Sequence, residues 1–195
     1  MTAKDMKIKC FSLIEEYYPE HNKMAEDEDV LYKINGVINQ IQMELMPLRK
    51  INASKEIEIT LDDDREINIL DYIDDMYQID KIRLDTDYDM PNDTTIIVPD
   101  DYEGTIKVYY FKNPELMKLS FETDDEYNLY DNQYEFELEP ILLEIMPWGI
   151  AAALLKMDMI TNYGRYFEEK YNLLRSSVDT RRSSGRITIT GGVDI

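Results

Sequence analysis

The chain has 195 residues, of which 44% are hydrophobic and 32% are charged. This length can bury a sizeable core, in one domain or in two small ones. With 41 acidic against 21 basic residues, the formal net charge of −20 excludes general binding to nucleic-acid phosphates or to anionic lipid.

Cysteine and histidine each occur once, as Cys10 and His21. One cysteine excludes an intramolecular disulfide framework and a cysteine-rich zinc site, and one histidine excludes multi-histidine metal sites. The N-terminus lacks a hydrophobic signal region, and the longest apolar stretch, residues 145–155, is shorter than the roughly 20 residues of a membrane-spanning helix. We therefore expect a protein that is made in a reducing cytoplasm and has no membrane partner.

Two helices are predicted in residues 1–50. Thr2 and Asp5 have the spacing of a capping box before a first helix over Ala3–Tyr18, and Pro47 closes a second helix over Asp27–Met46. Both helices carry apolar residues at helical spacing, so that Cys10 is predicted to be a core thiol. These residues are Met6, Cys10, Leu13, Ile14 and Tyr17 in the first helix, and Val30, Ile34, Val37, Ile38, Ile41 and Leu45 in the second.

An inserted antiparallel β-module is predicted over residues 51–113, because the apolar residues there alternate with polar ones. Asp62–Asp64 has the composition of a turn, and a change of phase at Asp80–Lys81 indicates a β-bulge. The predicted strands are Ile57–Leu61, Glu66–Leu70, Tyr77–Leu84, Thr94–Val98 and Thr105–Phe111.

Residues 114–180 are predicted to hold a loop and the C-terminal helices, although residues 113–139 show no clear pattern. A helix begins at Pro140, and Pro147 and Gly149 predict that it kinks or splits. A last helix over Asn162–Val178 has an apolar stripe of Phe167, Tyr171, Leu174 and Val178. The predicted fold class is α+β: a bundle of about four helices with an inserted small antiparallel β-module and an extended C-terminal tail.

Residues 181–195 are predicted to form that extended basic tail. Ser183–Gly185 has the composition of a flexible joint, and Ile187–Thr190 that of a short strand. Such a strand is not stable alone in water, so it either completes the chain's own sheet or adds to the edge of a partner's sheet. The predicted partner-binding residues are Arg181, Arg182, Arg186, Ile187, Thr188, Ile189 and Thr190.

The residue patterns do not indicate a catalytic, metal or cofactor site. Asp85, Asp87 and Asp89 have the first spacings of an EF-hand loop, but Met90 and Ile96 stand where that loop needs Gly and Glu. Pairs of carboxylates are expected by chance among so many acidic residues. We therefore predict a protein that is not an enzyme. An alternative function uses the charge itself: an acidic protein that mimics DNA and inhibits a nucleic-acid-binding enzyme.

Short stretches in three parts of the chain, together with the order of the predicted elements, resemble a known family. Residues 2–9 (Thr-Ala-Lys-Asp-Met-Lys-Ile-Lys) are similar to the start of its first helix, and residues 107–114 (Lys-Val-Tyr-Tyr-Phe-Lys-Asn-Pro) to a Tyr-rich strand with a Pro exit. Residues 168–175 (Glu-Glu-Lys-Tyr-Asn-Leu-Leu-Arg) and 179–186 (Asp-Thr-Arg-Arg-Ser-Ser-Gly-Arg) resemble its last helix and tail. The family is that of the head-to-tail adaptor proteins of tailed bacteriophages, also called connector or head-completion proteins.

This resemblance implies a structural virion protein in the neck, between capsid and tail. Copies would form a ring beneath the portal, with twelve subunits to match it, and would extend the channel through which genomic DNA passes without specific binding. The implied partners are the portal protein, other neck or tail proteins and further copies of the chain. Arg181, Arg182 and Arg186 would pair with acidic surface on the portal or on the adjacent copy, and Ile187–Thr190 would add a strand to a neighbour's sheet.

Overall fold

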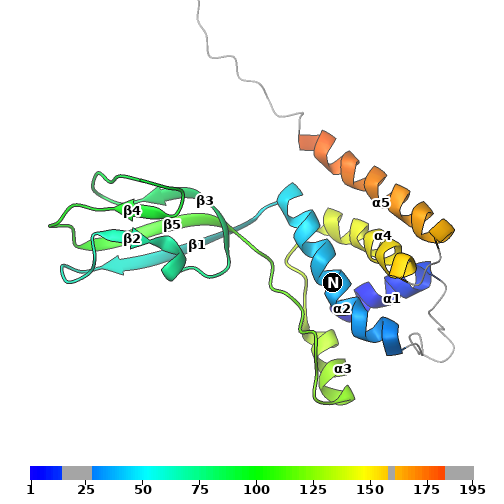
Figure 1. The fold of residues 1–195 in the computed structure, drawn as a ribbon. Helices are drawn as coiled ribbons and strands as arrows, with labels where there is room; N and C mark the ends of the chain where they lie inside the picture. Colours follow the sequence, from blue (N-terminus) through cyan, green and yellow to red (C-terminus); the bar gives the residue numbers. More distant parts are fainter. Residues whose placement is uncertain (15–27, 158–160, 183–195) are drawn as a thin grey trace, which may run out of the picture. The chain divides into compact units, whose positions relative to one another are not determined.

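The computed structural model describes residues 1–14, 28–157 and 161–182. Within them the protein combines five α-helices with two small antiparallel sheets, as an α+β fold does (Figure 1). The chain divides into a helical unit of residues 1–41, 117–134 and 140–195 and a β-unit of residues 42–116 and 135–139. Both segments of the β-unit therefore interrupt the sequence of the helical unit. The first boundary lies between Ile41 and Gln42, whereas the sequence placed the start of the β-module at residue 51.

Helix α1, Ala3–Leu13, begins with the predicted capping box. The Asp5 amide donates to Thr2 Oγ1 at 3.2 Å, and the Thr2 amide donates to Asp5 Oδ2 at 3.0 Å. The helix ends before the predicted Tyr18, because Ile14 already departs from helical geometry as its C-cap. Met6 and Cys10 are fully buried, and burial raises the pKa of Cys10 to about 12, which confirms a core thiol. The predicted apolar residue Tyr17 lies outside the described residues.

Replacing Asp5 by asparagine is expected to reduce the stability of the protein at neutral pH only. The hydrogen bonds with Thr2 lower the pKa of Asp5, so this carboxylate stabilises the fold above the ordinary pKa of an aspartate and loses that effect as the pH falls through its lowered value. Urea unfolding of Asp5→Asn and the unchanged protein across this pH range measures the difference. A difference in stability that is the same at neutral and strongly acidic pH contradicts this role of the charge.

Helix α2, Glu28–Leu45, continues into a short 3-10 helix, Met46–Leu48, which contains Pro47. Its predicted apolar stripe is confirmed, except that the side chain of Val30 lies outside the described residues. The buried members are Ile34, Val37, Ile38, Ile41 and Leu45.

Helix α3, Asp124–Gln133, lies in the segment where the sequence showed no clear pattern. Thr123 caps it by accepting a 3.1 Å hydrogen bond from the Glu126 amide. The helix has no apolar stripe, because its one buried residue is Asp131. The available sequence signal was the cap itself: a threonine followed by three acidic residues, which suit the positive end of the helix dipole.

Helices α4, Pro140–Met157, and α5, Thr161–Arg182, pack against each other, and α1 packs against α4 (Figure 1). Pro147 and Gly149 were predicted to kink or split the first of these helices, and the split is wrong because α4 is one continuous helix with Pro147 inside it. The side chains of Met146 and Ile150, which flank Pro147 and Gly149 in α4, are fully buried. This burial offsets the roughly 3 kcal/mol that an interior proline costs a helix.

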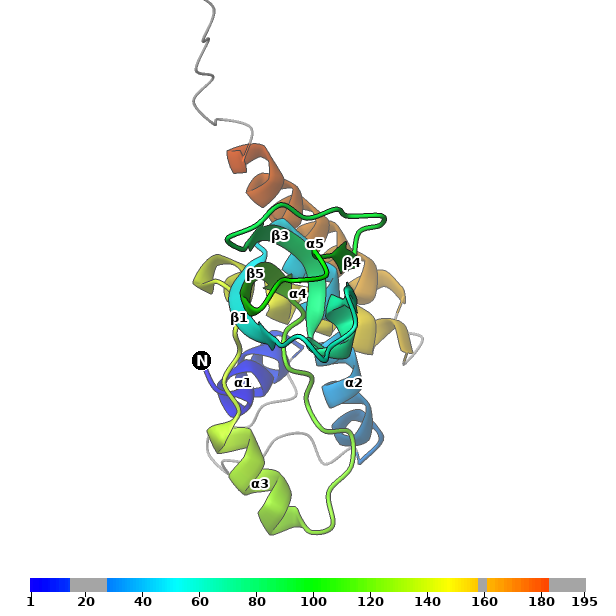
Figure 2. The ribbon, with the colours of Figure 1, turned by 90° about the vertical axis from the view of Figure 1, so that its left-hand side faces the viewer.

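The β-unit contains a three-stranded antiparallel sheet in the order β1-β5-β3, with β5 in the middle (Figures 1 and 2). The bounds are Ile51–Ile59 for β1, Met76–Arg83 for β3 and Gly104–Lys112 for β5. A second sheet pairs β2, Glu66–Asn68, with β4, Thr95–Ile97, and a 3-10 helix, η3, covers Ile69–Asp71.

Irregular pairing in β3 confirms the bulge that the change of phase predicted. Its register with β5 shifts between Ile79 and Lys81, and also between Met76 and Gln78. The prediction that Leu61 ends a half-buried strand is wrong: this side chain follows β1 and is 58% exposed. The core of the β-unit is aliphatic and consists mainly of Ile57, Ile59, Ile67, Ile69, Ile73, Ile82, Ile96, Val98, Ile106 and Val108.

Candidate functional site

The predicted partner-binding residues begin at the C-terminal end of helix α5, which packs closely against α4. Phe167, Tyr171 and Val178 are buried and Leu174 is half-buried, which confirms the predicted apolar stripe. At Gly149 of α4, a Cβ atom would lie 2.9 Å from Cε2 of Tyr171 and 3.2 Å from Cδ1 of Ile41. Only a residue without a side chain allows this separation, so Gly149 permits the tight packing of α5 on α4.

The other side of α5 faces solvent. Tyr166 and Leu173 are 58% and 64% exposed. Lys156 on α4 pairs with Glu168 at 2.5 Å, and Arg165 pairs with Glu169 at 3.1 Å. Exposed ion pairs of this kind add little stability, so the position of α5 depends mainly on its buried stripe.

The structure places the first two predicted site residues in the helix and not in an extended tail. Arg181 and Arg182 are the last residues of α5, which therefore continues past its predicted end at Val178. Arginine favours helical backbone, and cationic side chains stabilise the negative C-terminal end of a helix. The remaining site residues, Arg186, Ile187, Thr188, Ile189 and Thr190, lie outside the described residues, so their strand pairing stays a prediction.

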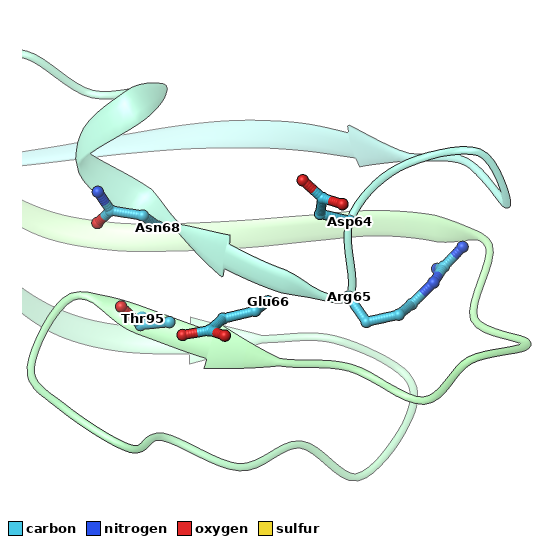
Figure 3. A pocket seen from close by; sticks show the side chains of 5 residues that line it. All are labelled: Asp64, Arg65, Glu66, Asn68 and Thr95. Atoms are coloured by element: carbon cyan, nitrogen blue, oxygen red, sulfur yellow. The ribbon is translucent and has the colours of Figure 1, made fainter.

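The β-unit carries most of the negative charge of the chain, with 22 acidic and eight basic residues. It also has a polar surface hollow of about 410 Å³ that is lined by Asp64, Arg65, Glu66, Asn68 and Thr95. Figure 3 shows the Arg65 side chain extending away from that of Glu66.

Arg65 is engaged in holding the turns around this hollow. Its Nη1 donates to the Tyr102 carbonyl at 2.9 Å, and its Nη2 donates to the carbonyls of Thr60 at 3.1 Å and Leu61 at 2.6 Å. The predicted Asp62–Asp64 turn is confirmed, because Asp63 accepts from the Thr60 amide at 2.7 Å. Because the Arg65 guanidinium donates to these three carbonyls, we interpret the hollow as a structural feature of the turns.

Both outer strands of the three-stranded sheet are edges, which the sequence did not reveal. The predicted first strand covered only Ile57–Leu61, because the preceding Asn52, Ser54 and Lys55 interrupt the apolar alternation. In the structure β1 begins at Ile51 and pairs with β5 in one unbroken antiparallel register. Among the described residues β1 has no strand on its other side. An edge of this kind can accept an added strand.

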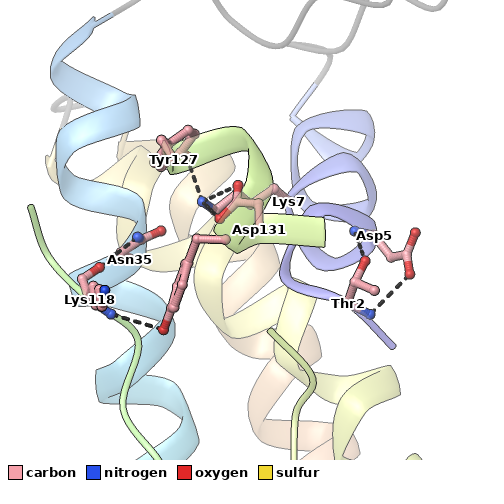
Figure 4. A network of polar contacts seen from close by, with 8 residues as sticks. Thr2, Asp5, Lys7, Asn35, Lys118, Tyr127 and Asp131 are labelled. Carbon is pink, nitrogen blue, oxygen red and sulfur yellow. Dashed lines mark hydrogen bonds and ion pairs between the residues drawn. The ribbon is translucent and has the colours of Figure 1, made fainter. Parts of the chain in front are cut away.

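A buried polar network joins α1 to α3 in the helical unit (Figure 4). Lys7 is fully buried and Asp131 is 2% exposed, and the Lys7 Nζ lies 2.7 and 2.9 Å from the two Asp131 carboxylate oxygens. The same Nζ lies 2.5 Å from the Tyr127 hydroxyl. Burial lowers the pKa of Lys7, whereas the Asp131 carboxylate acts in the opposite direction. Local sequence patterns do not reveal this pair, because its members lie in segments far apart in the chain.

Two asparagines of α2 hold the segment that leads into α3. Asn35 Nδ2 donates to the Lys118 carbonyl at 2.8 Å, and Asn39 Nδ2 donates to the Met117 carbonyl at 2.9 Å. Asn39 Oδ1 also accepts from the Met117 amide at 2.7 Å. Polar contacts with α1 and α2 therefore help to position residues 117–131, by direction as well as by burial.

Within residues 1–14, 28–157 and 161–182, no three His, Cys, Asp or Glu side chains are grouped so that they could hold a metal ion. No helix in this part of the chain is long and apolar enough to span a membrane. Two surface features stand out in the described part of the chain: the exposed side of α5 and the open sheet edge at β1.

Comparison with known proteins adds no family assignment. The chain matches no protein-family model, and no curated protein matches its sequence significantly.

Proposed function

We propose that this protein is a structural component of the neck of a tailed bacteriophage. In this proposal, copies of the chain form a ring of twelve beneath the portal, extend the DNA channel and link the head to the tail. The helices α1, α2, α4 and α5 form the bundle of each subunit. The observation that carries the proposal is the insertion of an antiparallel β-unit into the sequence of a helical unit whose last helix ends in Arg181 and Arg182.

The charge and composition of the chain support such a role. A contact between different surfaces of identical copies closes into a ring when its rotation allows. The 15 tyrosines and 11 methionines supply amphipathic and adaptable side chains of the kind that protein interfaces use. A net charge of −20 repels DNA, so a genome could pass the ring without adhering to it.

The tail provides the contact with the portal or with a neighbouring subunit in this proposal. Arg181, Arg182 and Arg186 bring positive charge to one end of an otherwise acidic chain. They would form charge-assisted hydrogen bonds with acidic surface on the portal or on a neighbouring subunit. Ile187–Thr190 would add a strand whose main-chain hydrogen bonds strengthen the contact.

Truncation of the chain at Ser184 is expected to leave a folded protein that no longer joins capsids. The last described element, α5, ends at Arg182, so the truncation leaves every described helix and strand intact. Circular dichroism checks the fold, and co-sedimentation with portal-containing capsids measures joining. A second truncation after Thr190 removes only Gly191–Ile195 and keeps the predicted strand; it serves as the matched control and should still bind.

Two outcomes contradict the proposal. If the protein truncated at Ser184 joins capsids normally, the tail has no role in joining. If the complete chain fails to join capsids and instead competes with DNA for a basic enzyme, with strong dependence on salt, the protein is an acidic DNA mimic.

A further inference from the structure

The two edges of the three-stranded sheet differ in regularity. Ser54 of β1 and Lys81 of β3 both lie opposite Tyr109 of β5, one on each side. On the β1 side the register is unbroken from Ile51 to Ile59, whereas the β3 side has two register shifts. Bulges protect an edge by disrupting the row of hydrogen-bonding groups that another strand would meet. The β1 edge lacks this protection.

The β1 edge is also accessible. Asn52, Ser54, Lys55, Glu56 and Glu58 are all exposed. In the described part of the chain, the backbone of β1 makes its hydrogen bonds with β5, and no bond from a turn or loop reaches it. The N–H and C=O groups on its outer side are therefore open to a further strand.

Lys55 of β1 contacts a segment that carries exposed apolar side chains. It donates a 2.5 Å hydrogen bond to the carbonyl of Tyr72, the residue that follows η3. Leu70 and Tyr72 are 47% and 41% exposed, although both are large and apolar. A strand added here with aliphatic side chains on one face would cover them.

We propose that the outer edge of β1, together with Leu70 and Tyr72, is the docking site for residues Arg186–Thr190 of a second copy of this chain. This inference rests on the proposed ring and names the contact between neighbouring subunits. Ile187 and Ile189 alternate with Thr188 and Thr190, so the added strand would turn its two isoleucines towards Leu70 and Tyr72.

Charge complementarity favours this occupant. Residues 181–195 contain three arginines and one aspartate, whereas the β-unit is strongly acidic. Glu58, near the end of β1, is exposed and has no ion pair among the described residues, so it is available to Arg186.

Pairing of two β1 edges with each other is less favourable. It would bring the exposed glutamates of both strands, Glu56 and Glu58, into one small interface. A contact between the edge of one copy and the tail of the next also joins two different surfaces. Such a contact can continue from subunit to subunit until a ring closes, whereas edge-to-edge pairing stops at a dimer.

The test uses three variants of the full chain, each with one added cysteine: Ser54→Cys on the β1 edge, Lys81→Cys on the β3 edge and Thr188→Cys in the tail. The native Cys10 is fully buried and does not compete. Concentrated Thr188→Cys is mixed with each edge variant and treated with a short bismaleimide. The mixture with Ser54→Cys is expected to give covalent dimers at least tenfold faster than the mixture with Lys81→Cys.

Equal rates at the two edges, or no dimers in either mixture, overturn the docking site. A double variant, Ser54→Cys with Thr188→Cys, tests whether the docked tail belongs to a second copy or to the same chain. If it cross-links within single chains in dilute solution, the second copy is not the occupant. If the protein joins capsids but shows no selective cross-linking, the adaptor function stands and this contact is wrong. If the cross-linking is selective but the protein does not join capsids, the contact stands and the adaptor function is wrong.

Discussion

Replacing Lys7 by methionine, or Asp131 by leucine, is expected to lower the free energy of unfolding by about 3–5 kcal/mol. Each substitution leaves one buried charge without its partner, because the side chains of Lys7 and Asp131 are 0% and 3% exposed. The remaining hydrogen bond between Lys7 and Tyr127 joins an ammonium to a neutral hydroxyl and cannot balance the charge. The fluorescence of Trp148, the single tryptophan, follows urea unfolding of the helical unit.

The double variant with methionine at Lys7 and leucine at Asp131 should be more stable than either single variant. It removes both charges and their desolvation together, so the effects of the two substitutions are strongly non-additive. Lys107→Met is the matched control, since Lys107 pairs with Glu56 at the same 2.7 Å on an exposed surface, where the stability should change little. Single variants at Lys7 and Asp131 that behave like this control would show that the buried pair does not hold α3 against α1.

Gly149→Ala and Gly36→Ala are expected to change stability in opposite directions. Alanine favours a helix over glycine by about 1 kcal/mol, so Gly36→Ala in α2 should stabilise the protein, because its new Cβ would lie 3.9 Å from Leu119. At Gly149 the new Cβ would lie 2.9 Å from the ring of Tyr171. Moving that buried ring should cost about 1–3 kcal/mol, which exceeds the gain in helix propensity.

The same fluorescence-detected unfolding measures both glycine variants. A further variant, Gly149→Ala combined with Tyr171→Leu, tests the cause: removing the ring should make the alanine far less harmful. If Gly149→Ala alone stabilises the protein as much as Gly36→Ala does, α4 and α5 are not packed closely at this point.

The apolar periodicity of the sequence predicted the helices that bury a stripe. The stripes around Ile34 in α2 and Phe167 in α5 are confirmed, as are the cap at Thr2 and the bulge near Lys81. These features depend on residues that lie close together in the chain, so a local pattern is sufficient to reveal them. Helix α3 was missed because its inward residue is Asp131, a charged side chain that no apolar pattern marks.

For the candidate docking site, the sequence indicated the tail as one half of a contact but not the surface that receives it. The β1 edge becomes visible only when β5 is seen to pair with β1 on one side and, with two register shifts, with β3 on the other. The pattern predicts that α5 ends at Val178, whereas the helix continues to Arg182. The composition of Arg181 and Arg182 is compatible both with a helix and with an extended tail, so it does not place this end.

Composition and short-range spacing are sufficient to predict the α+β class, the acidic character and the apolar faces of the main helices. The folded chain is needed to see that Lys7 meets Asp131, that Gly149 lies against Tyr171, and that β1 is the regular edge of its sheet. Each of these contacts joins residues from different elements. Their energies depend on burial and on distances of a few ångströms, which no local pattern of residues contains.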